Sequence, residues 1–288
     1  MRRLIVNADD FGLTSGVNDA ISHANQQGVV TSATIMANSR AFTEAVMIAG
    51  NQAALHTGCH VVLIDGIPIV SSHKSVVAQG GAFRSSLREF AAAAVRQRID
   101  PAEIEREAEA QIAKIQSSGL TVTHVDSHKH THMFPHVLRP VLRAARTRGV
   151  RAVRNPFEPR RAWTGRIIMA APGLWLRSCA VMVFNMFAAE FYRAVKAVGM
   201  VTTDGTVGIA VTGRLDQRIL LAILRALPEG TWELVCHPGY SDADLQAAGT
   251  RLLKSREIEL SALTSEETKH ELERQKIELI SYADLLDL

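Results

Sequence analysis

Short apolar runs alternate along the chain with longer segments in which apolar residues recur every three to four positions. The short runs predict strands, and the longer segments predict amphipathic helices. Strands are expected at 3–8, 31–37, 57–63, 121–126, 150–154, 206–211 and 231–236. Helices are expected at 15–27, 40–50, 101–118, 135–148, 174–198, 215–226 and 265–275.

Strands that alternate with helices predict an α/β fold with a parallel sheet, either open or closed into a barrel. The 288 residues are enough for one large core, and we expect a single domain spanning 1–288. Residues 64–86 predict a long loop, and residues 167–198 predict an apolar helical insert. Asp100 and Pro101 are typical of a helix start, with an N-cap followed by proline at the first helical position.

The composition is that of a globular protein, with 47% hydrophobic and 21% charged residues. A net charge of +3 gives no support for a nucleic-acid partner. The cysteines Cys59, Cys179 and Cys236 lack CxxC spacing, which favours a reducing compartment over a disulfide framework. The apolar run after Arg2 and Arg3 is too short for the core of a signal peptide. We therefore expect a cytoplasmic protein.

Polar residues suited to metal binding and acid–base chemistry occur at the ends of four predicted strands. The first strand ends in Asp9 and Asp10, and the third carries His60. The fourth runs into HVDSHKHTHMFP (124–135), and the seventh ends in CHPG (236–239). The carboxyl ends of parallel strands meet at one edge of a sheet, where α/β folds place their chemistry. Adjacent strand residues point to opposite faces, so Asp9 and Asp10 can converge only where the backbone turns.

Each of these residues has a structural explanation when it is taken alone. His60 is typical of a hydrogen-bonded core histidine, paired aspartates are common in turns, and His237 precedes a Pro-Gly turn. Together, one carboxylate and two histidines from three strands predict a facial metal site with open positions. Cys59 and Cys236 each precede a candidate site histidine, so strand alternation predicts that both cysteines point away into the core.

These motifs resemble the YdjC-like (ChbG-type) carbohydrate deacetylase family. The motifs are NADDFG (7–12), GCH (58–60), THVDSHKHTHMFP (123–135) and CHPG (236–239), in the family's order. The segments TTDGTVGIAVTG (202–213) and GTWELVCHPGY (230–240) are similar to the HpnK-type branch associated with hopanoid biosynthesis. Where the family commonly has consecutive histidines, this chain has Lys129 between His128 and His130, which leaves the role of position 129 open.

The resemblance implies a TIM-barrel-like (β/α) barrel of about seven parallel strands, incomplete or distorted. It also implies a metal-dependent hydrolase that removes acetyl from an N-acetylated sugar, an N-acetylglucosaminyl hopanoid if the branch is as expected. Carried over by motif, Asp10, His60 and His128 would bind the metal ion. Asp9 would be the general base, and His237 would be the general acid.

Amide hydrolysis needs each of these roles. A bound divalent ion lowers the pKa of its water and polarises the amide carbonyl, and a general acid protonates the departing amine. We expect Arg154 to orient Asp9 or to bind the substrate. Asp126, His130 and His132 are also expected to bind the substrate. Two histidines suit zinc, whereas a carboxylate with waters suits magnesium or manganese, and the resemblance favours magnesium.

The segment LWLRSCAVMVFNMFAAEFYRAVKAVG (174–199) is apolar around more than one side of a helix. One interpretation is a core helix or a homodimer interface. The other is a lid that faces lipid, covers the apolar tail of a hopanoid and brings the protein into peripheral contact with the inner membrane. Proline, glycine, arginine and asparagine interrupt 167–189, so we do not predict a membrane span.

Four alternatives stay open. One is a deacetylase of soluble chitooligosaccharides. A glycosidase would need two carboxylates that flank a bond, about 5 Å or more apart, which adjacent aspartates serve poorly. A phosphoesterase with two metal ions would need more carboxylates than one. A non-enzymatic, membrane-associated lipid-binding protein would leave the histidines at the strand ends unexplained.

Overall fold

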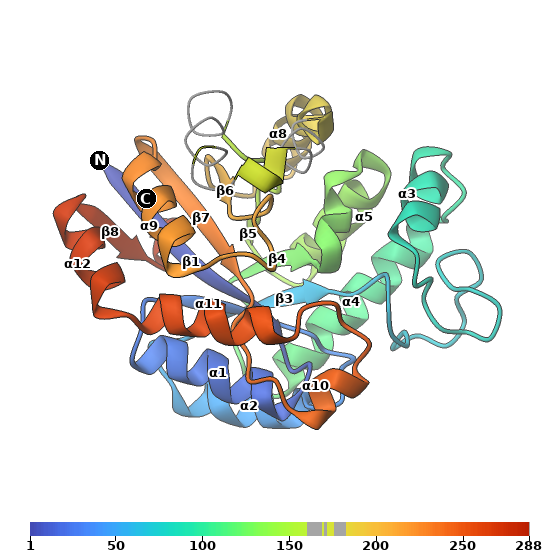
Figure 1. Ribbon diagram of the computed structural model, residues 1–288. Helices are drawn as coiled ribbons and strands as arrows, with labels where there is room; N and C mark the ends of the chain where they lie inside the picture. Colours follow the sequence, from blue (N-terminus) through green and yellow to red (C-terminus); the bar gives the residue numbers. More distant parts are fainter. Residues whose placement is uncertain (160–168, 170–171, 176–182, 288) are drawn as a thin grey trace.

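A curled parallel β-sheet forms the centre of the computed structural model, which describes residues 1–159, 169, 172–175 and 183–287 (Figure 1). Seven strands lie in the order β5-β4-β3-β2-β1-β7-β6, and all their ladders are parallel. An eighth strand, β8, pairs with β1. The strands are β1 (Arg2–Phe11), β2 (Ser32–Ile35), β3 (His56–Val61), β4 (His124–Ser127), β5 (Ala152–Val153), β6 (Gly205–Val207), β7 (Gly230–Cys236) and β8 (Ile277–Ile280).

The two ends of the strand order come together without a regular ladder. The amide of Val153 in β5 donates a hydrogen bond to the carbonyl of Val201, and the amide of Thr206 in β6 donates to the carbonyl of Phe157. A closed barrel would have a continuous strand pair here, so the sheet is an incomplete barrel. The predicted TIM-barrel-like α/β fold of about seven parallel strands, incomplete or distorted, is confirmed.

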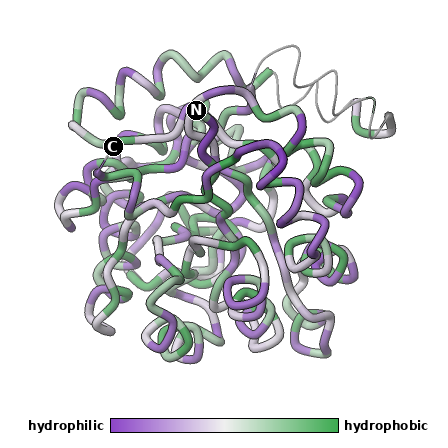
Figure 2. The backbone as a smooth tube through the Cα atoms, turned by 90° about the vertical axis from the view of Figure 1, so that its left-hand side faces the viewer, coloured by the Kyte–Doolittle hydropathy of each residue, from purple (hydrophilic) through white to green (hydrophobic). Residues whose placement is uncertain are grey.

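Helices pack around this sheet. In Figure 1, α1, α2 and α11 lie side by side below the strands, and α1 contacts both of the others. The helical coils carry hydrophilic and hydrophobic residues in turn, as expected for helices with one buried side (Figure 2). The helices are α1 (Ser15–Gln26), α2 (Phe42–Asn51), α3 (Leu87–Val95), α4 (Pro101–Ser117), α5 (Pro135–Thr147), α8 (Ala188–Ala197), α9 (Gln217–Ala226), α10 (Ala243–Ala247), α11 (Lys254–Thr264) and α12 (Glu266–Arg274), and the 3-10 helices are η1 (His128–Met133), η2 (Pro172–Leu174), η3 (Asn185–Phe187) and η4 (Asp284–Asp287).

Most of the predicted elements are found within a few residues of their expected ends. The helix start at Asp100 is confirmed, because its side chain accepts a hydrogen bond from the amide of Ala102. Among the described α-helices and strands, α3, α10, α11 and β8 were not predicted, and the 3-10 helices η1 and η4 were not predicted either. The short strand β8 has only its first and last residues buried, so it shows neither a continuous apolar run nor a simple alternation.

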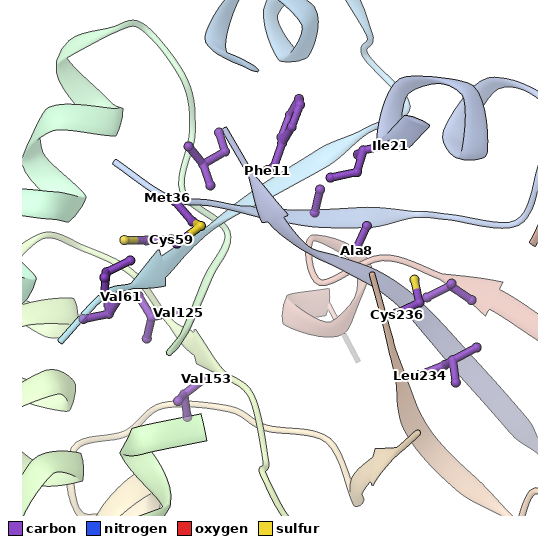
Figure 3. Close-up of a cluster of buried hydrophobic side chains, with 14 of the residues drawn as sticks. Ala8, Phe11, Ile21, Met36, Cys59, Val61, Val125, Val153, Leu234 and Cys236 are labelled. Atoms are coloured by element: carbon purple, nitrogen blue, oxygen red, sulfur yellow. The ribbon is translucent and has the colours of Figure 1, made fainter. Parts of the chain in front are cut away.

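The hydrophobic core fills the space between the sheet and its helices. Cys59 and Cys236 are both buried there as free thiols, beside side chains such as Val61, Val125 and Leu234 (Figure 3). Their position confirms that strand alternation turns them away from the neighbouring histidines. Cys179, the third cysteine, lies outside the described residues.

The predicted loop at 64–86 is attached to α4 by buried polar side chains spaced four residues apart. Gln111 exchanges two hydrogen bonds with the main chain of Val62, at 2.8 and 2.7 Å. Glu107 accepts hydrogen bonds from the amides of residues 69 and 70 and pairs with His73. Glu103 accepts hydrogen bonds from the amides of residues 74, 75 and 76. Buried main-chain amides need partners, so one polar stripe of α4 substitutes for secondary structure in the loop.

The apolar insert is described in part. Residues 167, 168, 170, 171 and 176–182 of the insert lie outside the described residues, and the rest contains η2, η3 and α8. Phe184 and Phe187 pack edge-on against Phe134, with ring centroids 6.1 Å apart in each pair, whereas Val183 and Met186 have exposed fractions of 65% and 71%. Among the described residues, no helix has the length and apolar character needed to cross a membrane.

We expect Glu103→Gln to lower the free energy of unfolding by about 1–3 kcal/mol, because one amide oxygen cannot replace two carboxylate oxygens as acceptor for the loop. Burial opposes ionisation, but the hydrogen bonds from Ser75, Lys74 and Val76 hold the pKa of Glu103 at about 2. The stability from this depressed pKa is complete above the ordinary value of 4.5 and is lost as pH falls toward 2.

Urea denaturation of the unaltered protein and of Glu103→Gln over this pH range measures the difference in the free energy of unfolding. The control is Glu109→Gln, at a half-buried position on the same helix. A deficit in the Glu103 variant that stays constant down to low pH would contradict the assignment.

Candidate active site

Asp9 and Asp10 converge because β1 loses its regular register at this point. The pairing of β1 with β2 shifts between Ala8 and Phe11, and Asp10 has φ +68°, in the left-handed region. A non-glycine residue in this region costs about 1–3 kcal/mol, so such a conformation persists only where its surroundings impose it. Without this turn, the two adjacent side chains would point to opposite faces of the sheet. Both carboxylates are buried, with exposed fractions of 2% and 3%.

Asp10, His60 and His128 come together at the carboxyl ends of β1, β3 and β4. Asp10 Oδ1 lies 3.6 Å from His60 Nε2 and 3.3 Å from His128 Nδ1. The two imidazole nitrogens are 3.3 Å apart. Ligands about 2.1 Å from an ion lie about 3.0 Å apart at octahedral angles and about 3.4 Å apart at tetrahedral angles. Buried Asp10 Oδ1 has no hydrogen-bond partner among the described residues. The donor set therefore fits a divalent ion.

His60 is fixed by a second carboxylate on its far side. Its Nδ1 lies 2.7 Å from Asp126 Oδ1, an arrangement that orients metal-binding histidines in many proteins. Burial alone would lower the pKa of His60, but the carboxylates of Asp126, Asp9 and Asp10 raise it to about 9. The surroundings thus favour positive charge at this position, which is the charge that a divalent ion would supply.

Asp9 is held by Arg154. The two terminal guanidinium nitrogens donate to the two oxygens of Asp9 at 2.8 and 2.6 Å, and Asn7 donates to Asp9 at 3.0 Å. Arg154 also forms ion pairs with Asp126 and Glu233. Burial would raise the pKa of Asp9, but Arg154 keeps it well below the usual range. Of the two predicted roles for Arg154, the structure shows the contact that orients Asp9.

The residues predicted to bind substrate do not all reach the surface of the site. Asp126, His132 and Arg154 each have an exposed fraction of 0%. His132 contacts Ser127 Oγ at 2.6 Å and the carbonyl of Arg154 at 3.1 Å. These three side chains make their contacts inside the site, and the expectation that they bind substrate stays a prediction. Of the four residues predicted to bind substrate, His130 alone has accessible surface.

In an extended chain the three histidines of DSHKHTH would all point in one direction. In the structure they point in different directions. Residues 128–133 form the 3-10 helix η1, and Lys129 and His130 adopt left-handed φ values of 54° and 53°. The turn directs His128 toward Asp10 and His60, and it directs His132 into the interior. Lys129, the residue between His128 and His130, forms an ion pair with Asp65 of the long loop and so links η1 to that loop.

His237 faces Asp9 across the site. Its Nε2 lies 3.9 Å from Asp9 Oδ2, and its amide donates to Glu259 Oε2 at 2.6 Å. Burial lowers the pKa of His237 to about 4, against the opposing effect of Asp9 and Asp10. At neutral pH the imidazole is therefore uncharged, and it can accept a proton at one nitrogen.

Two motif glycines are required by close approach. A Cβ at Gly58 would lie 2.5 Å from the ring of His124, which stacks on Tyr282 at a centroid distance of 3.7 Å. A Cβ at Gly239 would lie 2.8 Å from Cδ of Arg256. The glycines of GCH and CHPG therefore leave room for side chains that support the site.

Sequence reasoning missed two site residues, Arg256 and Glu259, on helix α11. Arg256 pairs with Asp10 Oδ2, and Glu259 contacts His237. The helix places charged residues on its buried as well as its exposed side, so no apolar stripe marks it in the sequence. The helix carries four charged residues, Lys254, Arg256, Glu257 and Glu259, and nothing in the sequence distinguishes the two that are buried.

The sheet and its strand-end cluster define an α/β barrel-like protein with a candidate metal centre beside an aspartate–histidine pair. Residues 3–274 match the family described as YdjC-like protein, and the chain belongs to this family. It is 33% identical over 284 residues to a carbohydrate deacetylase of Brevibacillus brevis, covering 98% of this chain and 99% of that protein. It is 34% identical over 288 residues to a carbohydrate deacetylase of Geobacillus stearothermophilus, covering 100% and 99%.

Solved structures agree with the fold. A crystal structure from Enterococcus faecalis, described in terms of cellobiose-phosphate cleavage, superposes with a TM-score of 0.77 at 27% identity, covering 99% of this chain and 98% of that chain. A lactam utilization protein from Thermus thermophilus gives a TM-score of 0.52 at 12% identity, covering 97% and 99%, which is a likeness of fold alone.

We expect Arg154→Leu to lower the free energy of unfolding by at least about 3 kcal/mol, because it leaves three buried carboxylates without their shared cation. Urea denaturation measures this loss, and Arg146→Leu, which removes an exposed arginine from α5, is the matched control. Equal stability of the two variants would contradict the central position given to Arg154.

Proposed function

We propose that this protein is a metal-dependent hydrolase that removes the acetyl group from an N-acetylated carbohydrate. The observation that carries the proposal is the convergence of Asp10 Oδ1, His60 Nε2 and His128 Nδ1, where the carboxylate oxygen has no hydrogen-bond partner within the described part of the chain. Asp9 and His237 lie directly beside this cluster. The relatives described as carbohydrate deacetylases align over nearly the whole chain, which supports the same substrate class.

Asp10, His60 and His128 would hold the ion. When bound, it supplies an activated water and a positive charge that polarises the amide carbonyl. The mixed oxygen and nitrogen donors suit magnesium, manganese or zinc, and we propose magnesium first. His128 is the most accessible of the three ligands, with its side chain 20% exposed, so substrate and water would approach from its side.

Asp9 and His237 would move the proton that hydrolysis requires. Asp9 stays ionised because Arg154 binds both of its oxygens, so it can accept a proton from the attacking water. His237 Nε2, 3.9 Å away, would take that proton from Asp9 and deliver it to the departing amine nitrogen. The amide C–N bond then breaks, and acetate and the free amine are the products.

The same contacts weigh against a glycosidase. A glycosidase needs two carboxyl groups on opposite sides of the scissile bond, one of them protonated. Here Asp9 is bound by Arg154 and Asp10 by Arg256, and both pKa values lie well below the ordinary range. Neither carboxylate is suited to be the acid.

For the substrate we propose an N-acetylglucosaminyl hopanoid, with soluble chitooligosaccharides as the alternative. The supporting observation is the set of exposed apolar side chains along the insert, where Trp175, Val183 and Met186 have exposed fractions of 54%, 65% and 71%. Apolar groups gathered in one segment are typical of a surface that contacts lipid or another protein. These side chains would cover the polycyclic tail of the substrate while its sugar reaches the metal ligands. In this position the insert would be in peripheral contact with a membrane.

Loss of the metal and loss of the base should be separable. We expect His60→Ala and Asp10→Asn to abolish binding of Mn²⁺ in titration calorimetry, because each removes a ligand. Asp9→Asn should still bind Mn²⁺ but release acetate about two to four orders of magnitude more slowly. His270→Ala, at an exposed position on α12, is the control and should change neither property. Equal metal loss in Asp9→Asn and Asp10→Asn would contradict this division of roles.

The exposed and packed halves of the insert should also behave differently. We expect Val183→Ser with Met186→Ser to raise KM for a lipid-linked substrate about tenfold, through lost apolar burial, without changing a soluble substrate or the Tm. Phe184→Ser should instead lower the Tm, because that ring packs against Phe134.

A homodimer interface would show itself differently, as dissociation of the Val183 and Met186 variant in light scattering. Equal effects of this variant on both substrates would contradict the lipid-facing lid.

A further inference from the structure

Helix α11 buries two ionisable side chains that reach toward the candidate active site. Arg256 and Glu259, three residues apart, have exposed fractions of 0% and 1%. Burying an ion costs several kcal/mol before any partner is found, and apolar side chains would usually serve packing better. Each of these side chains has one partner in the candidate active site, Asp10 for Arg256 and His237 for Glu259.

Arg256 determines which oxygen of Asp10 is available. One terminal nitrogen pairs with Asp10 Oδ2, and Nε donates to the carbonyl of Leu252 at 3.1 Å. The second contact fixes the plane of the guanidinium group. With Oδ2 occupied, Asp10 presents Oδ1 alone to His60 and His128.

Glu259 supports His237 from the opposite side to Asp9. Oε2 accepts the His237 amide at 2.6 Å and lies 3.9 Å from Nδ1 of the ring, a buried nitrogen with no hydrogen-bond partner among the described residues. Oε1 accepts the amide of Gly213 at 3.4 Å. The carboxylate therefore ties His237 to the segment after β6, with the ring's Nε2 directed at Asp9.

We propose that α11 is a second support of the active site, in which Arg256 is the positioning residue for the metal ligand Asp10 and Glu259 is the positioning residue for His237. The inference rests on the proposed function. It goes further by assigning roles to two residues of a helix that carries none of the motif residues.

The test of Arg256 keeps its charge and changes its shape. Arg256→Lys retains one positive charge but loses the planar fork that joins Asp10 to Leu252. Because the charge near the ion is the same, any change in Mn²⁺ affinity reports the orientation of Asp10. We expect the Kd for Mn²⁺ in titration calorimetry to rise about tenfold to a hundredfold. Arg106→Lys, an exposed arginine on α4, is the matched control and should leave the Kd unchanged.

The test of Glu259 separates kcat from KM. Glu259→Gln keeps the shape and one acceptor oxygen but replaces the carboxyl group that faces the His237 ring, whose pKa burial raises to about 7. We expect kcat for acetate release from a soluble N-acetylated chitooligosaccharide to fall about tenfold to a hundredfold, with KM and the Kd for Mn²⁺ unchanged. The control is Glu273→Gln, at an exposed position on α12. Thermal melts of all four variants show whether each is folded.

Two results would overturn the proposal. One is an unchanged Kd in Arg256→Lys together with an unchanged kcat in Glu259→Gln. The other is a lowered Tm with parallel losses in Mn²⁺ binding, KM and kcat, which is the pattern of side chains that only hold the fold together. Failure of the proposed function would be visible in the unaltered protein, as absence of Mn²⁺ binding and of acetate release, and would remove this inference with it.

Discussion

The structure depends on one buried cation, the guanidinium group of Arg154. It follows β5 and pairs with Asp9 of β1, Asp126 of β4 and Glu233 of β7. Three carboxylates without solvent would repel each other and would not stay ionised, so the arrangement requires a shared positive charge. Through Asp126 the same cation reaches His60, because the Asp126 carboxylate orients that imidazole. Arg154 thus joins the interior of the sheet to both halves of the proposed chemistry, the candidate metal ligands and the candidate base.

The curled sheet explains how residues distant in sequence meet above that cation. Parallel strands end at one edge, and the order β4-β3-β2-β1-β7 brings the carriers of Asp126, His60, Asp9 and His237 to one region. The regular strand does not complete the site. β1 has to break its register and adopt a left-handed residue at Asp10, and the chain after β4 has to turn through η1 to aim His128. The candidate site residues Asp10 and His128 therefore lie where the backbone departs from regular strand pairing.

Local patterns in the sequence were sufficient for seven of the eight described strands, most helices and the strand-end motifs, because apolar periodicity and ligand-type residues are local signals. They could not give the direction of the side chains in DSHKHTH, since η1 has no strand parity, nor the burial of Arg154, which follows from partners on three other strands. Helix α11 was missed because its charged residues face inward as well as outward. In the insert, Phe184 packs against the core while Met186 is exposed, a difference that composition alone cannot reveal.

The central claim is that Asp10, His60 and His128 hold one divalent ion. Crystals soaked in Mn²⁺ and measured at the manganese absorption edge test it most directly, because anomalous scattering locates the ion without assumptions about activity. The account predicts a single anomalous peak in contact with Asp10 Oδ1, His60 Nε2 and His128 Nδ1. A second group of potential ligands, Asp9, His60 and Asp126, lies beside it. A peak at that group, or no peak at saturating Mn²⁺, would contradict the account.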